Sequence, residues 1–177
     1  MNTAHLHLLV NHLPILGTLF GILTLLTGMI LKNPSIKRTG LGALTLSAVF
    51  AVVAFTTGEG AEDAVEGLPG VGEAFISRHE EMADLFLGAG IIAGAIALLT
   101  FLADVLGWKA TRALYVLTLA AAAASMVLAQ KTGTSGGEIR HTEIRASVVN
   151  GDAGTNGNGA ETGGGTMESE ESEGDDD

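Results

Sequence analysis

Four long apolar runs constrain the fold of this chain more than any other feature of its sequence. A membrane-spanning helix needs roughly 20 mostly apolar residues; two of the runs exceed that length and two reach it with their flanks. The mean hydropathy of the chain is +0.39 despite a very polar C-terminus. The sequence therefore predicts an all-α integral membrane protein that forms a four-helix bundle. The runs cover residues 6–31, 41–55, 85–105 and 113–129.

The charge of the chain divides it into two parts. Nine acidic residues and no basic residue follow position 145, so this tail carries most of the net charge of −11. The tail is rich in Gly, Thr and Asn, a composition typical of segments without a packed core. The sequence predicts a transmembrane domain over residues 1–145 and a disordered acidic tail over residues 146–177. No basic face exists to meet a phosphate backbone, so nucleic-acid binding is not supported.

Turn signals between the runs predict where the helices begin and end. We expect helices over about residues 3–31, 40–57, 79–106 and 110–130, with an acidic loop between the second and the third. Pro14 should kink the first helix just beneath His12, because proline cannot donate a hydrogen bond to the carbonyl of Val10.

The loop between the first two helices predicts the orientation of the chain. This loop is short and carries three basic residues, and basic loops favour the cytoplasmic side. The amino terminus has no basic residue and its apolar run is too long for a signal peptide, so we expect a retained first helix. The prediction is a multi-pass protein of a bacterial inner membrane, with both termini outside.

Glycine spacing predicts where helices approach one another closely. Gly17 and Gly21, and also Gly90 and Gly94, form small-xxx-small patterns that suit tight helix contacts. Such faces also fit a structural or assembly subunit that packs against other subunits or a second copy of itself. After the fourth helix, the glycines at 136–137 permit tight turns, so a short segment there is expected to fold back over the bundle end.

Three histidines open the first helix in the stretch HLHLLVNHLP. At about 100° per residue, His5 and His12 lie within about 20° of one helix face, whereas His7 falls on the opposite side and is interpreted as having no role. The expected topology brings every histidine of the chain to the outer end of the bundle. Polar rings in an apolar helix need partners and usually mark a functional site.

A histidine-rich bundle end is typical of haem and metal sites, because facing helices supply the ligands. We predict haem b with His12 and His79 as its axial pair, and with His141 and His5 as further cofactor-binding residues. A non-haem copper, zinc or iron site would instead use His12, His79, His141 and Glu59. Glu59 is also expected to orient a ligand histidine by accepting a hydrogen bond from its second ring nitrogen. The chain has no cysteine, which excludes thiolate ligands.

Three functions stay open from the residues alone. The first is electron transfer at the outer face through bound haem, with a redox partner. The second is a structural or assembly subunit without a cofactor, and the third is non-haem metal binding. No Ser-His-Asp, HExxH or phosphate-loop pattern is present, so hydrolysis is not supported. The sequence predicts an electron-transfer or structural component rather than an enzyme.

Four short motifs resemble a known family. NHLP at 11–14, TGE at 57–59, the His79-Glu80 pair and GGEIRH at 136–141 are similar to motifs of small bacterial four-helix membrane proteins catalogued as a domain of unknown function. Some members are fused to Rieske-type or cytochrome-like redox modules. The resemblance implies a place near respiratory electron transfer, and it implies roles for His12, His79 and His141. His5 and His7 lie outside the matched pattern.

Overall fold

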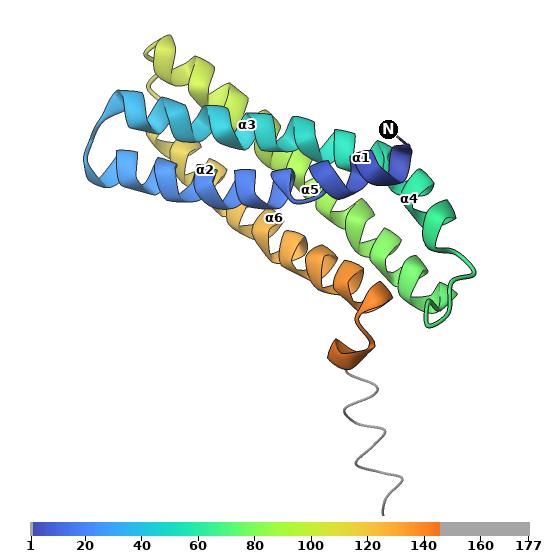
Figure 1. Ribbon diagram of the computed structural model, residues 1–177. Helices are drawn as coiled ribbons and strands as arrows, with labels where there is room; N and C mark the ends of the chain where they lie inside the picture. Colours follow the sequence, from blue (N-terminus) through green and yellow to red (C-terminus); the bar gives the residue numbers. More distant parts are fainter. Residues whose placement is uncertain (1, 146–177) are drawn as a thin grey trace, which may run out of the picture. The chain divides into compact units, whose positions relative to one another are not determined.

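Two helical hairpins make up most of the described chain (Figure 1). The computed structural model describes residues 2–145, and the predicted acidic tail lies outside them. The first hairpin joins α2 to α3 and the second joins α5 to α6, while α1 and α4 are short helices that pack against each other. The elements are α1 (Thr3–Val10), α2 (Leu13–Ile30), α3 (Pro34–Thr56), α4 (Gly58–Val65), α5 (Glu73–Val105), α6 (Thr111–Arg140) and the 3-10 turn η1 (Thr142–Ile144).

Four segments are long and apolar enough to cross a membrane. Many of their large apolar side chains are exposed, which suits contact with lipid. The prediction of an all-α membrane protein with four apolar helices is thus confirmed, and the described residues contain no strand. The segments are Thr3–Ile30, Pro34–Thr56, Glu73–Val105 and Thr111–Arg140.

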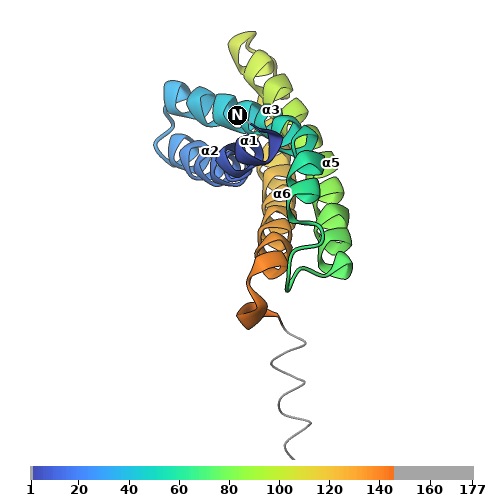
Figure 2. The same ribbon diagram turned by 45° about the vertical axis from the view of Figure 1, so that its right-hand side comes forward.

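The hairpins meet along α3 and α5, and α2 also contacts α6 (Figures 1 and 2). Arg38 of α3 pairs with Asp104 of α5 close to the two hairpin turns. We call the end that holds these turns the turn end. The opposite end, which holds α1 and α4, is the histidine end. The core between the ends is built from Leu25, Leu41, Leu44, Ala97, Tyr115 and Ala122.

The predicted kink at Pro14 is confirmed. Helix α1 ends at Val10 and α2 begins at Leu13, with Pro14 in its first turn. The carbonyl of Pro14 accepts hydrogen bonds from Thr18 Oγ1 at 2.8 Å and from Ser47 Oγ at 2.6 Å. The break lets α1 leave the line of α2 and pack against α4.

The predicted close contacts at the glycine patterns are also confirmed. A Cβ on Gly21 would stand 2.8 Å from the Leu44 side chain, and a Cβ on Gly94 would stand 2.3 Å from Cβ of Ala48. Both glycines are buried. These small-residue faces are therefore used between helices of the same chain.

Three helix boundaries differ from the predicted ones. Helix α3 begins at Pro34 rather than at 40, because the Asn33 side chain caps the first turn and proline fits there. Helix α5 begins at Glu73 rather than at 79. Helix α4 forms in the segment that the sequence predicts to be a loop.

Helix α6 continues to Arg140, ten residues past the predicted end at 130. The expected tight turns at the glycines of 136–137 are wrong, since these residues are helical. Glycine weakens a helix by only about 1 kcal/mol relative to alanine. Burial of Ser135 and Glu138 against the neighbouring helices offsets that cost.

Candidate functional site

His7 projects from α1 onto the end of α3. Its Nδ1 lies 2.9 Å from the carbonyl oxygen of Ala54 and 3.1 Å from Oγ1 of Thr57. A carbonyl oxygen can only accept, so Nδ1 carries the proton and donates it. The ring is half-buried. Its other nitrogen, Nε2, is left as an unprotonated lone-pair donor.

His79 makes the same contacts from α5 onto α6. Its Nδ1 lies 3.1 Å from the carbonyl oxygen of Thr132 and 3.2 Å from Oγ of Ser135. The carbonyl again fixes the proton on Nδ1 and leaves Nε2 unprotonated. This ring is half-buried as well. The backbone of Gly136 lies against it, since a Cβ there would stand 3.0 Å from Cε1 of the imidazole.

The two histidines therefore rest in matching cradles. The first cradle is Ala54, Thr57 and Gly58, and the second is Thr132, Ser135 and Gly136. Each supplies a carbonyl, a hydroxyl three residues later and a glycine directly after the hydroxyl. In each cradle the hydroxyl also donates to the cradle carbonyl, at 2.9 Å in the first and 3.0 Å in the second.

The two imidazoles lie within electrostatic range of each other. An Nδ1–H bond to a carbonyl fixes the tautomer and orientation of a histidine and makes Nε2 a better ligand, as metal-binding histidines usually require. The histidine end thus offers two nitrogen donors that are held in the same way, one by α3 and one by α6. Imidazole nitrogens are among the ligands that proteins supply to haem iron.

The ring that interacts with His79 belongs to His7 and not to His12. His12 is exposed, and its Nδ1 bonds the side chain of the neighbouring Asn11. The sequence did not predict this contact of His7 with the end of α3. His7 lies on the side of α1 that faces α3. Hydropathy did not reveal which side of α1 faces the bundle.

The other predicted site residues lie on the surface. His5 is exposed in the first turn of α1. His141 is exposed at the end of α6, with Nδ1 2.8 Å from Glu143 Oε1. Glu59 is exposed in the first turn of α4, where a carboxylate complements the helix dipole. Within residues 2–145, no group of three or more His, Asp or Glu side chains is arranged to hold a metal ion.

Sequence reasoning missed the hydroxyl groups of both cradles and one ion pair. Arg78, next to His79, donates from Nη1 to Oε2 of the buried Glu138 at 2.8 Å. This contact ties the start of α5 to the end of α6 beside the second cradle. Comparison of the segment TTGE at 56–59 with TSGGE at 134–138 is the signal that finds both cradles.

A pair of glutamates joins α4 to α5 at the same end. The Glu80 side chain hydrogen-bonds Glu62 and raises its pKa above the ordinary value, with smaller contributions from burial and from the charges of Glu80 and Asp63. Two carboxyl groups can hydrogen-bond only when one is protonated. Glu66 and Glu73 line the same cavity of about 210 Å³.

No family model, curated protein or solved structure matches this chain.

Proposed function

We propose that this chain is a membrane haem protein that transfers electrons, and that His7 and His79 are the axial ligands of haem b. The observation that carries the proposal is the pair of matching cradles, which present two neutral imidazoles with free Nε2 atoms at one end of the bundle. Haem iron takes this donor set in electron-transfer proteins.

The residues of the cradles have distinct tasks in this function. The carbonyls of Ala54 and Thr132 keep the proton on Nδ1, so each Nε2 would be available to haem iron as a neutral donor. The hydroxyls of Thr57 and Ser135 limit rotation of the rings. Bound haem supplies one-electron chemistry, while the chain orients the iron and tunes its potential through these contacts.

Two alternatives have less support. A non-haem copper, zinc or iron site needs three or four protein ligands, and residues 2–145 bring no such group together. A cofactor-free assembly subunit would use its small-residue faces for partner helices. The pattern glycines Gly21 and Gly94 are instead buried between helices of this chain. Membership of the four-helix family named above stays a prediction, and of its implied ligands only His79 belongs to the proposed pair.

The test is an absorption spectrum of the detergent-purified full chain, first oxidised and then reduced with dithionite, with haem and iron measured on the same sample. We expect a sharp reduced α-band and about one haem per chain. His7→Ala and His79→Ala should each abolish the band. The control variants His5→Ala, His12→Ala and His141→Ala should keep it.

Two results would contradict the proposal. One is colourless, iron-free protein from cells well supplied with haem. The other is loss of haem in His12→Ala together with a normal spectrum in His7→Ala, which would restore the predicted His12–His79 pair. Helical circular dichroism and gel filtration of each variant separate loss of haem from loss of fold.

Thr57→Val and Ser135→Ala test the positioning role of the hydroxyls. Both variants keep the carbonyl contact and should keep haem. Each should shift the midpoint potential in the same direction, because the two hydroxyls make matching contacts. An unchanged potential in both would assign the hydroxyls to helix structure alone.

A further inference from the structure

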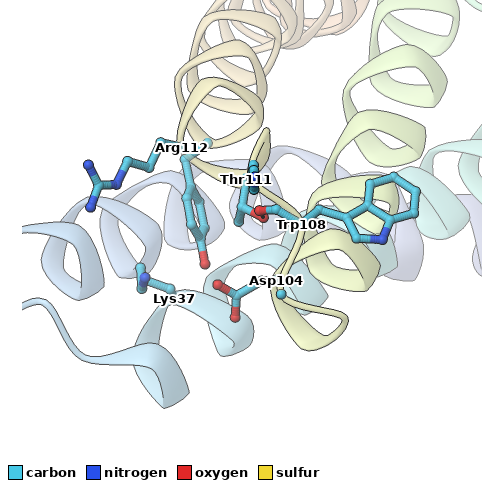
Figure 3. Close-up of a pocket in the computed structure, with 8 residues that line it drawn as sticks. Lys37, Asp104, Trp108, Thr111 and Arg112 are labelled. Carbon is cyan, nitrogen blue, oxygen red and sulfur yellow. Dashed lines mark hydrogen bonds between the residues drawn. The ribbon is translucent and has the colours of Figure 1, made fainter.

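The turn end carries a pocket of about 490 Å³ between α3, α5 and α6 (Figure 3). Lys37 reaches it from α3 and Asp104 from the end of α5. Trp108 comes from the turn between α5 and α6, and Arg112 from the first turn of α6. In Figure 3, Lys37 and Arg112 lie on one side of Asp104 and Trp108 lies on the other.

The charges that line this pocket favour an anion. Lys37, Lys109 and Arg112 all line it, and none of the three forms an ion pair within residues 2–145. The only acidic lining residue is Asp104. Its carboxylate is already paired with Arg38, whose Nε lies 2.7 Å away. The pocket therefore holds an excess of positive charge.

Tyr115 adds a buried hydrogen-bond donor to the same pocket. The residue is 5% exposed, and its ring lies beneath Lys37, with Nζ 4.6 Å from the ring centroid. Its buried hydroxyl lies beside the Asp104 carboxylate. A phosphate oxygen in the pocket would give this donor a second acceptor.

The surroundings of the pocket indicate where such an acceptor comes from. Trp108 is 50% exposed and the neighbouring Leu106 is 65% exposed. A half-exposed tryptophan beside basic residues at the end of an apolar helix is typical of the membrane–water boundary. At that level the abundant anions are lipid phosphates, and clustered Lys and Arg bind them.

We propose that this pocket binds the phosphate group of an anionic phospholipid. Lys37 and Arg112 form charge-assisted contacts with the phosphate oxygens, and the Tyr115 hydroxyl donates to one of them. The lipid chains lie along the apolar surface beside Leu106. The site is at the opposite end of the bundle from the histidines and does not depend on bound haem.

The experiment measures thermal unfolding of the delipidated full chain while phosphatidylglycerol, phosphatidylcholine or inorganic phosphate is added. We expect saturable stabilisation by phosphatidylglycerol and little by the other two. Lys37→Gln/Arg112→Gln should weaken phosphatidylglycerol binding on the order of twentyfold, at about fivefold for each cation. Lys131→Gln/Arg140→Gln removes the same charge from exposed positions of α6 away from the pocket and should bind as the wild type does.

Each other outcome overturns the proposal or part of it. Wild-type lipid binding by the Lys37/Arg112 variant would overturn the site. Equal stabilisation by inorganic phosphate, lost in the same variant, would assign the pocket to a soluble phosphate compound instead of a lipid. If that variant does not fold, Tyr115→Phe, which removes one hydroxyl only, carries the test and should weaken phosphatidylglycerol binding severalfold.

Discussion

The α2–α3 hairpin and the α5–α6 hairpin bury the same pattern of positions. All five buried residues of α2 have a buried counterpart in α5 at a constant spacing of 72 residues, and His7 has the same spacing from His79. The pairs are Pro14 with Phe86, Thr18 with Gly90, Gly21 with Ala93, Leu25 with Ala97 and Gly28 with Thr100.

Helices α3 and α6 match in the same way at a spacing of 78 residues. Among the buried residues of α3, Leu41 is the one departure, because its counterpart Leu119 is only partly buried. The first and second cradles follow the same spacing. The other buried pairs are Gly40 with Thr118, Leu44 with Ala122, Ser47 with Ser125, Ala51 with Ala129 and Ala54 with Thr132.

The two hairpins, each with the helical segment before it, are therefore versions of one structural unit, and His7 and His79 occupy equivalent positions in it. The hairpins differ in two layers. In each layer, one hairpin has a pair of hydrogen-bonded hydroxyls and the other has glycine in place of one or both. Thr18 and Ser47 hydrogen-bond at 2.8 Å in the first hairpin, whereas glycine replaces the threonine in the second. Thr100 and Thr118 hydrogen-bond at 2.8 Å in the second, where the first has two glycines.

The largest expected effect comes from the glycine layer of the first hairpin. A Cβ on Gly40 would stand 2.5 Å from the backbone nitrogen of Leu25, so Gly40→Ala must push α2 and α3 apart. We expect a loss of about 3 kcal/mol in the free energy of unfolding. The matched change Thr118→Ala removes the hydroxyl that bonds Thr100 and the Leu114 carbonyl, and should cost only about 1–2 kcal/mol. Reversible unfolding in mixed detergent micelles measures both, and equal losses would show that the two layers pack alike.

The serine layer should show a smaller contrast. Ser47 Oγ bonds Thr18 and the carbonyl of Pro14, so Ser47→Ala should cost about 1 kcal/mol. Ser125 is buried, and its hydroxyl has no partner within the described residues. Ser125→Ala should therefore be neutral or stabilising in the same unfolding assay. A loss in Ser125→Ala as large as that in Ser47→Ala would show that the second hydroxyl has a partner after all.

The smallest expected effect is a pH dependence of local stability that only the first hairpin should show, because only that hairpin is followed by α4. The folded-state pKa of Glu62 is raised above 4.5, so its contribution to stability is complete below that pH. This contribution is lost as pH rises through the raised pKa, because Glu62 and Glu80 are then both charged and repel each other. The protection factors of the α4 amides, which compare their exchange with the intrinsic rate at the same pH, should fall across this rise, while those at the end of α6 should not change.

Glu62→Gln is the control for the pH effect. Glutamine can hydrogen-bond Glu80 at any pH, so the protection factors of the α4 amides should no longer depend on pH in this range. An unchanged pH dependence in this variant would place the titration on another group.

Several features of the fold were open to prediction from local sequence. The apolar runs determined four membrane-spanning helices, because only a helix satisfies its own backbone within lipid. Pro14 determined the break in the first segment, and Gly21 and Gly94 marked close contacts. The ends of α3 and α6 were less predictable, because a cap at Asn33 and the burial of Glu138 decided them.

Local sequence was enough to predict the membrane fold and the gathering of histidines in its terminal and connecting segments. Which of these histidines pack onto the bundle depended on tertiary contacts. Hydropathy acts locally and does not specify how α1 is turned, and the break before Pro14 separates the orientation of His7 from that of His12. Packing of α1 against α3 and α4 brought His7 inward, whereas His12 remained exposed.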